Sequence, residues 1–190
     1  MRVISGTAKG RKLASFRGDR IRPTADRVKE ALFNIITSNF GPIDGKTVLD
    51  LFSGTGNLGI EAVSRGAAKA VFVDEAPGSI SVLRKNIETC GLSERAEVLR
   101  TSVLHGTRFL SKRGESFDLV FLDPPYEKGL VEETLKAIVT DGIINDGAVV
   151  IVEHSLRETP SDEYEGLTLT DRRKYGDTEI SFYQAIGKRH

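Results

Sequence analysis

The sequence lacks the features typical of exported, membrane-spanning or metal-binding proteins. Cysteine occurs once, as Cys90, so no disulfide can form within the chain, and no cysteine or histidine spacing is typical of a zinc site. No apolar run reaches about 18 residues, and no signal-peptide pattern is present. We therefore expect a cytoplasmic protein that needs neither a metal nor a membrane.

Net charge is also absent, with 27 Lys or Arg against 27 Asp or Glu, and this balance alone argues against a nucleic-acid partner. The distribution of charge indicates the opposite. Residues 1–30 contain nine Lys or Arg and three Asp or Glu, whereas the remaining 160 residues contain 18 and 24. Such a basic end favours a polyanionic partner, although a solvated basic arm without a partner would have the same composition.

The length and composition fit one α/β domain with a small extension. Of the 190 residues, 39% are hydrophobic and 28% are charged, as in ordinary globular proteins. Residues 1–40 are expected to form the extension. It would consist of two short strands, 2–5 and 12–16, joined by a glycine-containing turn, and a helix that ends before Gly41. Residues 41–190 would form the main domain.

From residue 45 onward the apolar pattern alternates between strand and helix. The expected strands are 47–51, 70–74, 96–100, 117–122 and 148–153. The expected helices are 57–65, 78–90 and 129–140. Repeated units of this length predict a parallel sheet that is covered by helices on both faces. The tail, LTLTDRRKYGDTEISFYQAIG, alternates on both sides of a turn and predicts an antiparallel hairpin at one end of the sheet.

A glycine-rich loop follows the first core strand. Gly54, Gly56 and Gly59 form a G-x-G-x-x-G pattern, and Asp74 follows 20 residues after Gly54, as in dinucleotide-binding enzymes. Asp50 ends the strand just before this loop, however, and a carboxylate there would repel a pyrophosphate. An acid at this point suits a cationic ligand, such as the amino end of a methionine moiety. The pattern therefore favours S-adenosylmethionine, with an NAD-dependent enzyme or a purely structural turn as alternatives.

The stretch FDLVFLDPPYEKG raises a second chemical question, since an apolar strand ends directly on Asp123-Pro124-Pro125-Tyr126. The carboxyl ends of parallel strands open onto the edge where such sheets bind ligands. Asp123 and the Pro124 carbonyl offer acceptors for the N–H groups of an amine, while the prolines stiffen the turn. Tyr126 offers a ring on which a base can stack. The structural alternative is a strand that ends in a proline-rich turn.

These motifs together resemble a known family over nearly the whole chain. The likeness rests on RVISGTAKGRKL, RPTADRVKEALFN, LDLFSGTGNLGIEAVSRGA and DPPY. The chain resembles the class I methyltransferases and, within them, the RsmD-type 16S rRNA guanine-N2 methyltransferases. The resemblance implies a Rossmann-like α/β fold with a seven-stranded, mostly parallel sheet and an antiparallel C-terminal hairpin. It also implies S-adenosylmethionine as methyl donor and a guanine of the assembling small ribosomal subunit as acceptor.

The resemblance also implies which residues form the site. The donor would be held by Asp50, Phe52, Ser53, Gly54 and Gly56, with Asp74 on its ribose. Such families often have an acid after the third strand that contacts the adenine amine; here Ser102 and Val103 take that place. The acceptor base would be held by Asp123, Pro124, Pro125 and Tyr126.

The basic N-terminus then acquires a role as an RNA-contacting surface. The residues expected to contact phosphates are Arg2, Lys9, Arg11, Lys12, Arg22 and Arg27. We expect a monomer that acts on 16S rRNA. Three alternatives remain open at this point: an enzyme for adenine N6 in nucleic acid, an enzyme for a small-molecule amine, and a ribosome-assembly factor without catalysis.

Overall fold

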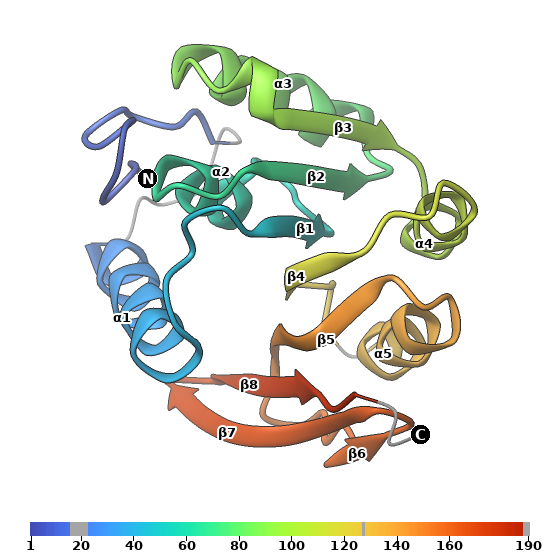
Figure 1. The fold of residues 1–190 in the computed structure, drawn as a ribbon. Coiled ribbons are helices and arrows are strands. Elements are labelled where there is room, and N and C mark those ends of the chain that lie inside the picture. Colours follow the sequence, from blue (N-terminus) through green and yellow to red (C-terminus); the bar gives the residue numbers. More distant parts are fainter. Residues whose placement is uncertain (16–22, 127, 188–190) are drawn as a thin grey trace.

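The computed structural model describes residues 1–15, 23–126 and 128–187 and contains one mixed sheet flanked by helices (Figure 1). The strands are β1 (Thr47–Leu51), β2 (Lys69–Asp74), β3 (Ala96–Arg100), β4 (Phe117–Leu122), β5 (Ile144–Ser155), β6 (Glu163–Tyr164), β7 (Leu167–Tyr175) and β8 (Thr178–Ala185). The helices are α1 (Pro23–Phe40), α2 (Asn57–Ser64), α3 (Pro77–Thr89), the single 3-10 turn η1 (Ser93–Arg95), α4 (Val103–Lys112) and α5 (Leu130–Thr140).

The strand order across the sheet is β3-β2-β1-β4-β5-β8-β7-β6. Strands β1 to β5 pair in parallel, whereas β5 with β8, β8 with β7, and β7 with β6 pair antiparallel. The order reverses between β1 and β4, and the carboxyl ends of both strands open at that switch point. The topology therefore confirms the expected Rossmann-like arrangement and fixes where a ligand site can form.

Neighbouring residues of each core strand pack on opposite faces of the sheet, as the period of a strand requires. In β1, Val48 packs against the helices of one face, α1, α2 and α3, while Leu49 packs against α4 and α5 on the other. Both residues are completely buried, as expected for strands covered on both sides. The two helix layers are visible to either side of the sheet in Figure 1.

Several sequence-based boundaries need correction. Helix α4 was not expected, because its buried stripe is only Val103, Thr107 and Leu110 and it contains a glycine, Gly106, in its interior. The sheet has an eighth strand, β6, whose two residues are too few to give an alternating pattern. Strand β5 is also longer than expected, since it spans twelve residues.

The N-terminal hairpin is confirmed in a shorter form than expected. Arg2 and Lys12 face each other in one antiparallel bridge. The amides of Ile4 and Ser5 then leave the hairpin and donate to the Glu61 carboxylate on α2, at 2.8 and 3.0 Å. Strand pairing therefore stops before residue 5, and the end of the second expected strand, residue 16, lies outside the described residues.

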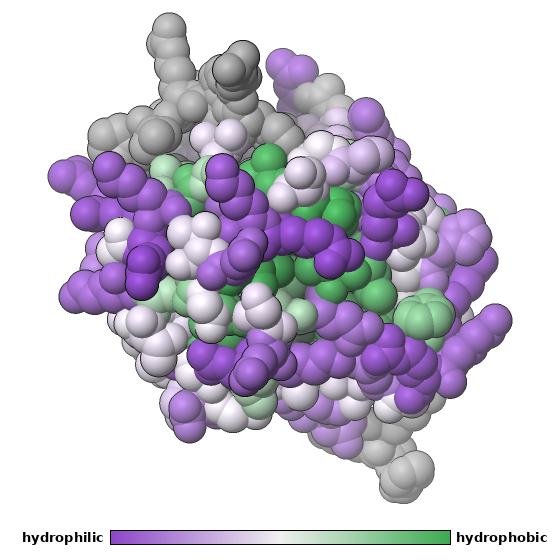
Figure 2. All heavy atoms as spheres, turned by 90° about the horizontal axis from the view of Figure 1, so that it is seen from above, coloured by the Kyte–Doolittle hydropathy of each residue, from purple (hydrophilic) through white to green (hydrophobic). Residues whose placement is uncertain are grey.

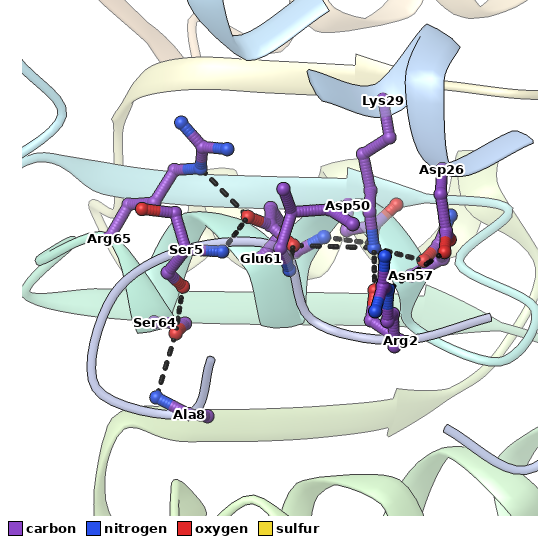
Figure 3. Close-up of polar contacts among 12 residues, drawn as sticks. Arg2, Ser5, Ala8, Asp26, Lys29, Asp50, Asn57, Glu61, Ser64 and Arg65 are labelled. Atoms are coloured by element: carbon purple, nitrogen blue, oxygen red, sulfur yellow. Dashed lines mark hydrogen bonds and ion pairs between the residues drawn. The ribbon is translucent and has the colours of Figure 1, made fainter. Parts of the chain in front are cut away.

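Glu61 is the centre of a buried polar cluster that joins the N-terminus to the domain (Figure 3). Besides the two amides of Ile4 and Ser5, its carboxylate contacts Lys29 Nζ from α1 at 3.2 Å and Arg65 Nε at 2.8 Å. Lys29 Nζ also donates to the Arg2 carbonyl, at 2.7 Å. Burial lowers the pKa of Lys29 below its ordinary value, while the Glu61 charge opposes this shift. Four positive or N–H donors thus satisfy one buried carboxylate.

Ser64, one turn after Glu61, makes a second set of contacts to the hairpin. Its hydroxyl accepts from the Ala8 amide at 2.9 Å and donates to the Ser5 carbonyl at 2.6 Å. Gly6 lies so close to α2 that an added Cβ would stand 1.7 Å from the Ser64 carbonyl oxygen, and its φ of 84° also favours glycine. The hairpin is therefore fitted to this helix by both shape and hydrogen bonds.

The extension shares its apolar core with the main domain. Val3 and Leu13 of the hairpin and Phe33 of α1 belong to the same buried cluster as Val48 and Phe121 of the sheet. The division at residue 40 thus does not separate two hydrophobic cores, and it stays a prediction about function. No helix in the described part of the chain has the length and apolarity needed to cross a bilayer.

The Glu61 cluster leads to a prediction about stability. Glu61→Gln removes the negative charge and leaves Lys29 buried without its ionic partner, which typically costs about 3–5 kcal/mol. We expect the free energy of unfolding, measured by urea denaturation, to fall by that amount. Glu88→Gln, an exposed position on α3, is the matched control and should change it by less than about 0.5 kcal/mol. A loss below about 1 kcal/mol for Glu61→Gln would contradict the role given to the cluster.

Candidate functional site

A cavity of about 720 Å³ lies at the carboxyl ends of the parallel strands. It brings together eight residues that the sequence singled out from four separate segments. These residues are Phe52, Asp74, Ser102, Val103, Asp123, Pro124, Pro125 and Tyr126. Residues that the sequence reasoning missed complete the lining, among them Glu75, Ser79, Leu104, Glu133 and Thr134. The expected donor and acceptor segments therefore meet at one site.

The other expected donor residues, Asp50, Ser53, Gly54 and Gly56, do not line this cavity but form its support. Ser53 is buried, and its hydroxyl has no hydrogen-bond partner among the described residues. Such an orphaned polar atom is costly unless a ligand or water satisfies it. This hydroxyl therefore fits a site for a polar ligand next to the cavity.

Asp74 at the end of β2 anchors the glycine-rich loop. One carboxylate oxygen accepts from the Gly54 amide at 2.9 Å, and the other accepts from the Ala76 amide at 2.9 Å. Each oxygen keeps a further lone pair, so the carboxylate can still accept from hydroxyl groups in the cavity. Backbone amides thus hold both carboxylate oxygens of Asp74, the residue expected to bind a ribose.

Asp50 is buried beneath the loop, and its carboxylate accepts from the Gly59 amide at 2.9 Å. Burial and, to a smaller extent, the charges of Asp123 and Asp74 raise its pKa to about 8, against the opposing effect of the hydrogen bond from Gly59. A carboxyl with such a pKa is mostly protonated at neutral pH. A cationic ligand nearby would stabilise its ionised form.

The backbone of the loop adopts conformations that few residues tolerate. Phe52 has a φ of 57°, the only positive value for a non-glycine among the described residues, and its side chain lines the cavity. Strained positions of this kind cluster at functional sites. Gly56 has a φ of 81°, and an added Cβ would stand 2.3 Å from Leu83 Cδ1. The conformation and the close packing therefore both favour glycine at this position.

Asp123 lies where the acceptor side of the cavity begins, and the sheet register places a second acid beside it. Leu122 of β4 pairs with Val152 of β5, so Asp123 and Glu153 are the next residues on two neighbouring strands. The side chain of Asp123 is reached by solvent, yet dense surrounding protein raises its pKa to about 7, and the Glu153 charge adds to this shift. The site thus holds two acceptors of which one titrates near neutral pH.

Tyr126 connects the two carboxylates to a second cavity. Its hydroxyl donates to Glu153 Oε1 at 3.0 Å. Burial and the Glu153 charge raise its pKa above the ordinary value, so the ring keeps its O–H proton. Tyr126 and Glu153 also line a cavity of about 650 Å³, together with Lys29 and Asn57 near the N-terminus of α2. Tyr126 therefore lies between the two cavities and is 43% exposed.

Ser102 precedes α4 and closes the donor side. Its hydroxyl is 2.8 Å from His105 Nδ1. This serine lines the cavity at the place where the resemblance predicted a contact to adenine. That contact stays a prediction.

The expected RNA-contacting cations are exposed where they are described. Lys9, Arg11 and Lys12 lie on the outer side of the hairpin, and Arg27 lies on α1. Arg2 is exposed too, but its Nε pairs with Asp26 at 3.2 Å. The sixth residue of that prediction, Arg22, lies outside the described residues.

The chain is similar to a described protein family and to several known proteins. A family model described as conserved hypothetical protein 95 matches residues 1–184. The ribosomal RNA small subunit methyltransferase D of Haemophilus influenzae is 35% identical over 187 residues, which cover 97% of this chain and 93% of that protein. The Bacillus subtilis protein YlbH is 38% identical over 188 residues, which cover 98% of this chain and 100% of that protein. The solved structure of Escherichia coli yhhF is 33% identical, with a TM-score of 0.84 and 99% of both chains covered.

The carboxylate pair gives a prediction about titration. In the Glu153→Gln variant the neighbouring negative charge is lost, so ionisation of Asp123 becomes easier and its pKa should fall below about 7. It should stay above the ordinary value of 3.8, because burial is the larger cause. Carboxyl carbon NMR of Asp123 measures this shift. Glu163→Gln on β6 is the control and should leave the titration unchanged, and equal curves for both variants would contradict the pairing.

Proposed function

The chain belongs to the conserved hypothetical protein 95 family, which includes ribosomal RNA small subunit methyltransferase D, and we propose that it methylates the exocyclic N2 amine of a guanine in 16S rRNA. The observation that carries the proposal is the pair of acids on neighbouring strand ends, Asp123 and Glu153, beside the exposed ring of Tyr126. Asp123 and Tyr126 line the cavity that contains Asp74 and Phe52, and Glu153 lines the neighbouring cavity, which shares Tyr126 with the first. Donor and acceptor would therefore meet at Asp123.

The donor side fits S-adenosylmethionine, which supplies an electrophilic methyl group when bound. Asp74 would accept hydrogen bonds from ribose hydroxyls, and the unpartnered hydroxyl of Ser53 would bind a polar group of the same ligand. Asp50 would face the cationic amino end, since ligand charge favours the ionised form of this buried acid. Ser102 and Val103 would contact the adenine end.

The acceptor side has the chemistry that an aromatic amine requires. The lone pair of such an amine is delocalised into the ring, which makes the nitrogen a weak nucleophile. Asp123 and the Pro124 carbonyl would accept hydrogen bonds from its two N–H groups, hold the amine in place and stabilise the positive charge that develops. Tyr126 would stack on the base, a contact worth about 1–3 kcal/mol. With a pKa of about 7, Asp123 is also suited to take the proton that the methylated amine releases.

Glu153 favours guanine over adenine as the base. Guanine presents two kinds of donor on this edge, the N2 amine and the neighbouring N1–H, and a second carboxylate beside Asp123 can accept from N1–H. Adenine presents an amine next to an unprotonated N1, whose lone pair would face a carboxylate without a proton between them. A flipped base is commonly read through hydrogen bonds to this edge. The acid pair therefore supports the guanine N2 assignment.

The RNA substrate explains the exposed cations on the hairpin and α1. A small-molecule amine would have no use for Lys9, Arg11, Lys12 and Arg27, whereas each can contact a phosphate. The hairpin is also fixed rigidly to α2 beside the site, through Glu61 and Ser64. We propose that it grips RNA next to the target guanine.

The first test of this function is a methylation assay with Asp123→Ala. Small ribosomal subunits from a strain without this gene are incubated with labelled S-adenosylmethionine, and the nucleosides are separated. We expect label in N2-methylguanosine, lowered at least about a hundredfold in the variant, because an acceptor for the developing charge is lost. Asp146→Ala, an exposed position on β5, is the control and should keep full activity.

The other outcomes of this assay are informative. Label in N6-methyladenosine would keep the role of Asp123 and overturn the guanine assignment. Full activity of Asp123→Ala would contradict the proposed acceptor side. If the protein binds S-adenosylmethionine but labels neither subunits nor free rRNA nor DNA, a small-molecule amine becomes the favoured acceptor.

Asp50 provides an independent test through donor binding. Because its pKa is about 8 in the free protein, binding of the cationic donor at pH 7 should release close to one proton, and affinity should rise with pH up to about 8. Calorimetry in two buffers of different ionisation enthalpy measures this release. Asp50→Asn should abolish it and weaken binding about tenfold or more, since a charge-assisted contact is lost.

The control for this measurement is Asp44→Asn, an exposed acid before β1. It should leave both the affinity and the proton release unchanged. Proton release that persists in Asp50→Asn would show that another group titrates on binding.

A further inference from the structure

A second basic segment lies far from the N-terminus in the sequence. Residues 98–113 contain four Lys or Arg and no Asp or Glu. These cations are Arg100, Arg108, Lys112 and Arg113. The segment runs from the edge strand β3 through α4 and interrupts a part of the chain that is otherwise acidic. These cations belong neither to the lining of the donor cavity nor to the hairpin.

The segment forms a groove of about 610 Å³ between β3 and α4. Its apolar part consists of Val98 and Leu99 of β3 and the ring of Phe109. Its polar residues are Arg100, Thr101, His105, Arg108 and Lys112. Figure 2 shows the side of the molecule on which β3 and α3 lie, with apolar side chains between charged ones along the middle of the face.

Three cations of the groove have no partner. Arg100, Arg108 and Lys112 are exposed, and their side chains form no hydrogen bond or ion pair within the described part of the chain. Arg113, in contrast, is engaged: it pairs with Glu97 and Glu115 and lies over the Phe109 ring at 5.3 Å. The groove therefore presents free positive charge rather than a surface network.

Phe109 adds an aromatic face to this charge. It is 48% exposed, one of three large hydrophobic residues exposed in the described chain. An exposed aromatic ring among unpaired cations is the combination that binds single-stranded nucleic acid, because bases stack on the ring while phosphates meet the cations. A protein partner would need acidic residues matched to three separate cations. A flexible polyanion meets this requirement through its repeating phosphates.

The groove and the cavity are lined by neighbouring residues of one segment. Thr101 and His105 line the groove, while Ser102, Val103 and Leu104 between them line the cavity. The hairpin, by contrast, docks on α2. An RNA that spans the site could therefore contact both surfaces.

We propose that the β3–α4 groove binds a second segment of the substrate RNA, with phosphates on Arg100, Arg108 and Lys112 and an unpaired base on Phe109. This proposal rests on the proposed function, since it takes rRNA as the substrate. The groove supplies affinity and orientation and contributes nothing to methyl transfer. Two separated contacts would hold the target guanine over Tyr126 while it is flipped, which costs a few kcal/mol when the base is stacked.

The test is a measurement of RNA affinity with the full chain and 16S rRNA transcribed in vitro. The variant Arg108→Glu/Lys112→Glu removes two phosphate contacts and leaves Arg100, which lies next to the donor site, intact. We expect binding to weaken at least about tenfold near 0.1 M salt. The slope of log affinity against log salt should become shallower by about 1.4, since each contact to single-stranded RNA contributes about 0.7.

The matched control is Arg84→Glu/Lys85→Glu on α3, where both residues are exposed. It makes the same change in net charge at another place. An equal loss of RNA affinity in both variants would mean that the affinity depends on total charge, and this would contradict RNA binding by the groove. Affinity for S-adenosylmethionine should be unchanged in both variants, and this verifies that they are folded.

Phe109→Ala separates RNA from a simple polyanion. It should weaken rRNA binding about fivefold or more, by the loss of one stacked base, and leave binding of inorganic polyphosphate unchanged. Unchanged rRNA binding in this variant and in Arg108→Glu/Lys112→Glu would refute the proposal. If the proposed function itself were wrong, the result would be different, because the unaltered protein would then neither bind nor methylate rRNA.

Discussion

The arrangement of the whole molecule depends on one buried carboxylate, that of Glu61. It receives hydrogen bonds or ion pairs from the hairpin, from α1 and from its own helix α2. Water cannot replace these partners because the residue is completely buried. Helix α2 also begins directly after the glycine-rich loop, so the same helix that carries Glu61 positions the donor side. The basic hairpin and the site are thereby held in one fixed relation.

A second constraint is the parallel register of the sheet. Asp50, Asp74, Asp123 and Glu153 follow one another on the ends of β1, β2, β4 and β5, so four acids meet at one edge. Desolvation by the surrounding protein and, to a smaller extent, the neighbouring acids raise the pKa values of Asp50 and Asp123 to about 8 and about 7. Such a cluster is unfavourable in the free protein and becomes favourable beside a cationic ligand. The repulsion between these acids in the free protein would therefore favour binding of a cationic ligand.

The sequence predicted the local features of this design and missed those that depend on register. Asp123 and Tyr126 were recognisable because the strand and its proline turn lie within one short stretch. Glu153 was not, although a strand was expected there, because only the pairing of Leu122 with Val152 brings it beside Asp123. Helix α4 was missed for a different reason: it has only four buried residues, and one of them is a glycine. The roles of individual residues in binding donor and RNA stay predictions.

The absence of net charge no longer argues against an RNA substrate once charge is placed in space. Residues 1–30 carry a net charge of +6 and residues 98–113 carry +4, so the other 144 residues carry −10. A uniformly basic protein would attract RNA in any orientation. A protein with two basic surfaces on an acidic body attracts a polyanion where these surfaces lie and repels it elsewhere, so the field selects orientation as well as rate of encounter. On the proposed function, neutrality is therefore the sum of two attractive segments and a repulsive remainder, and such a distribution would orient the RNA toward the edge that contains Asp123.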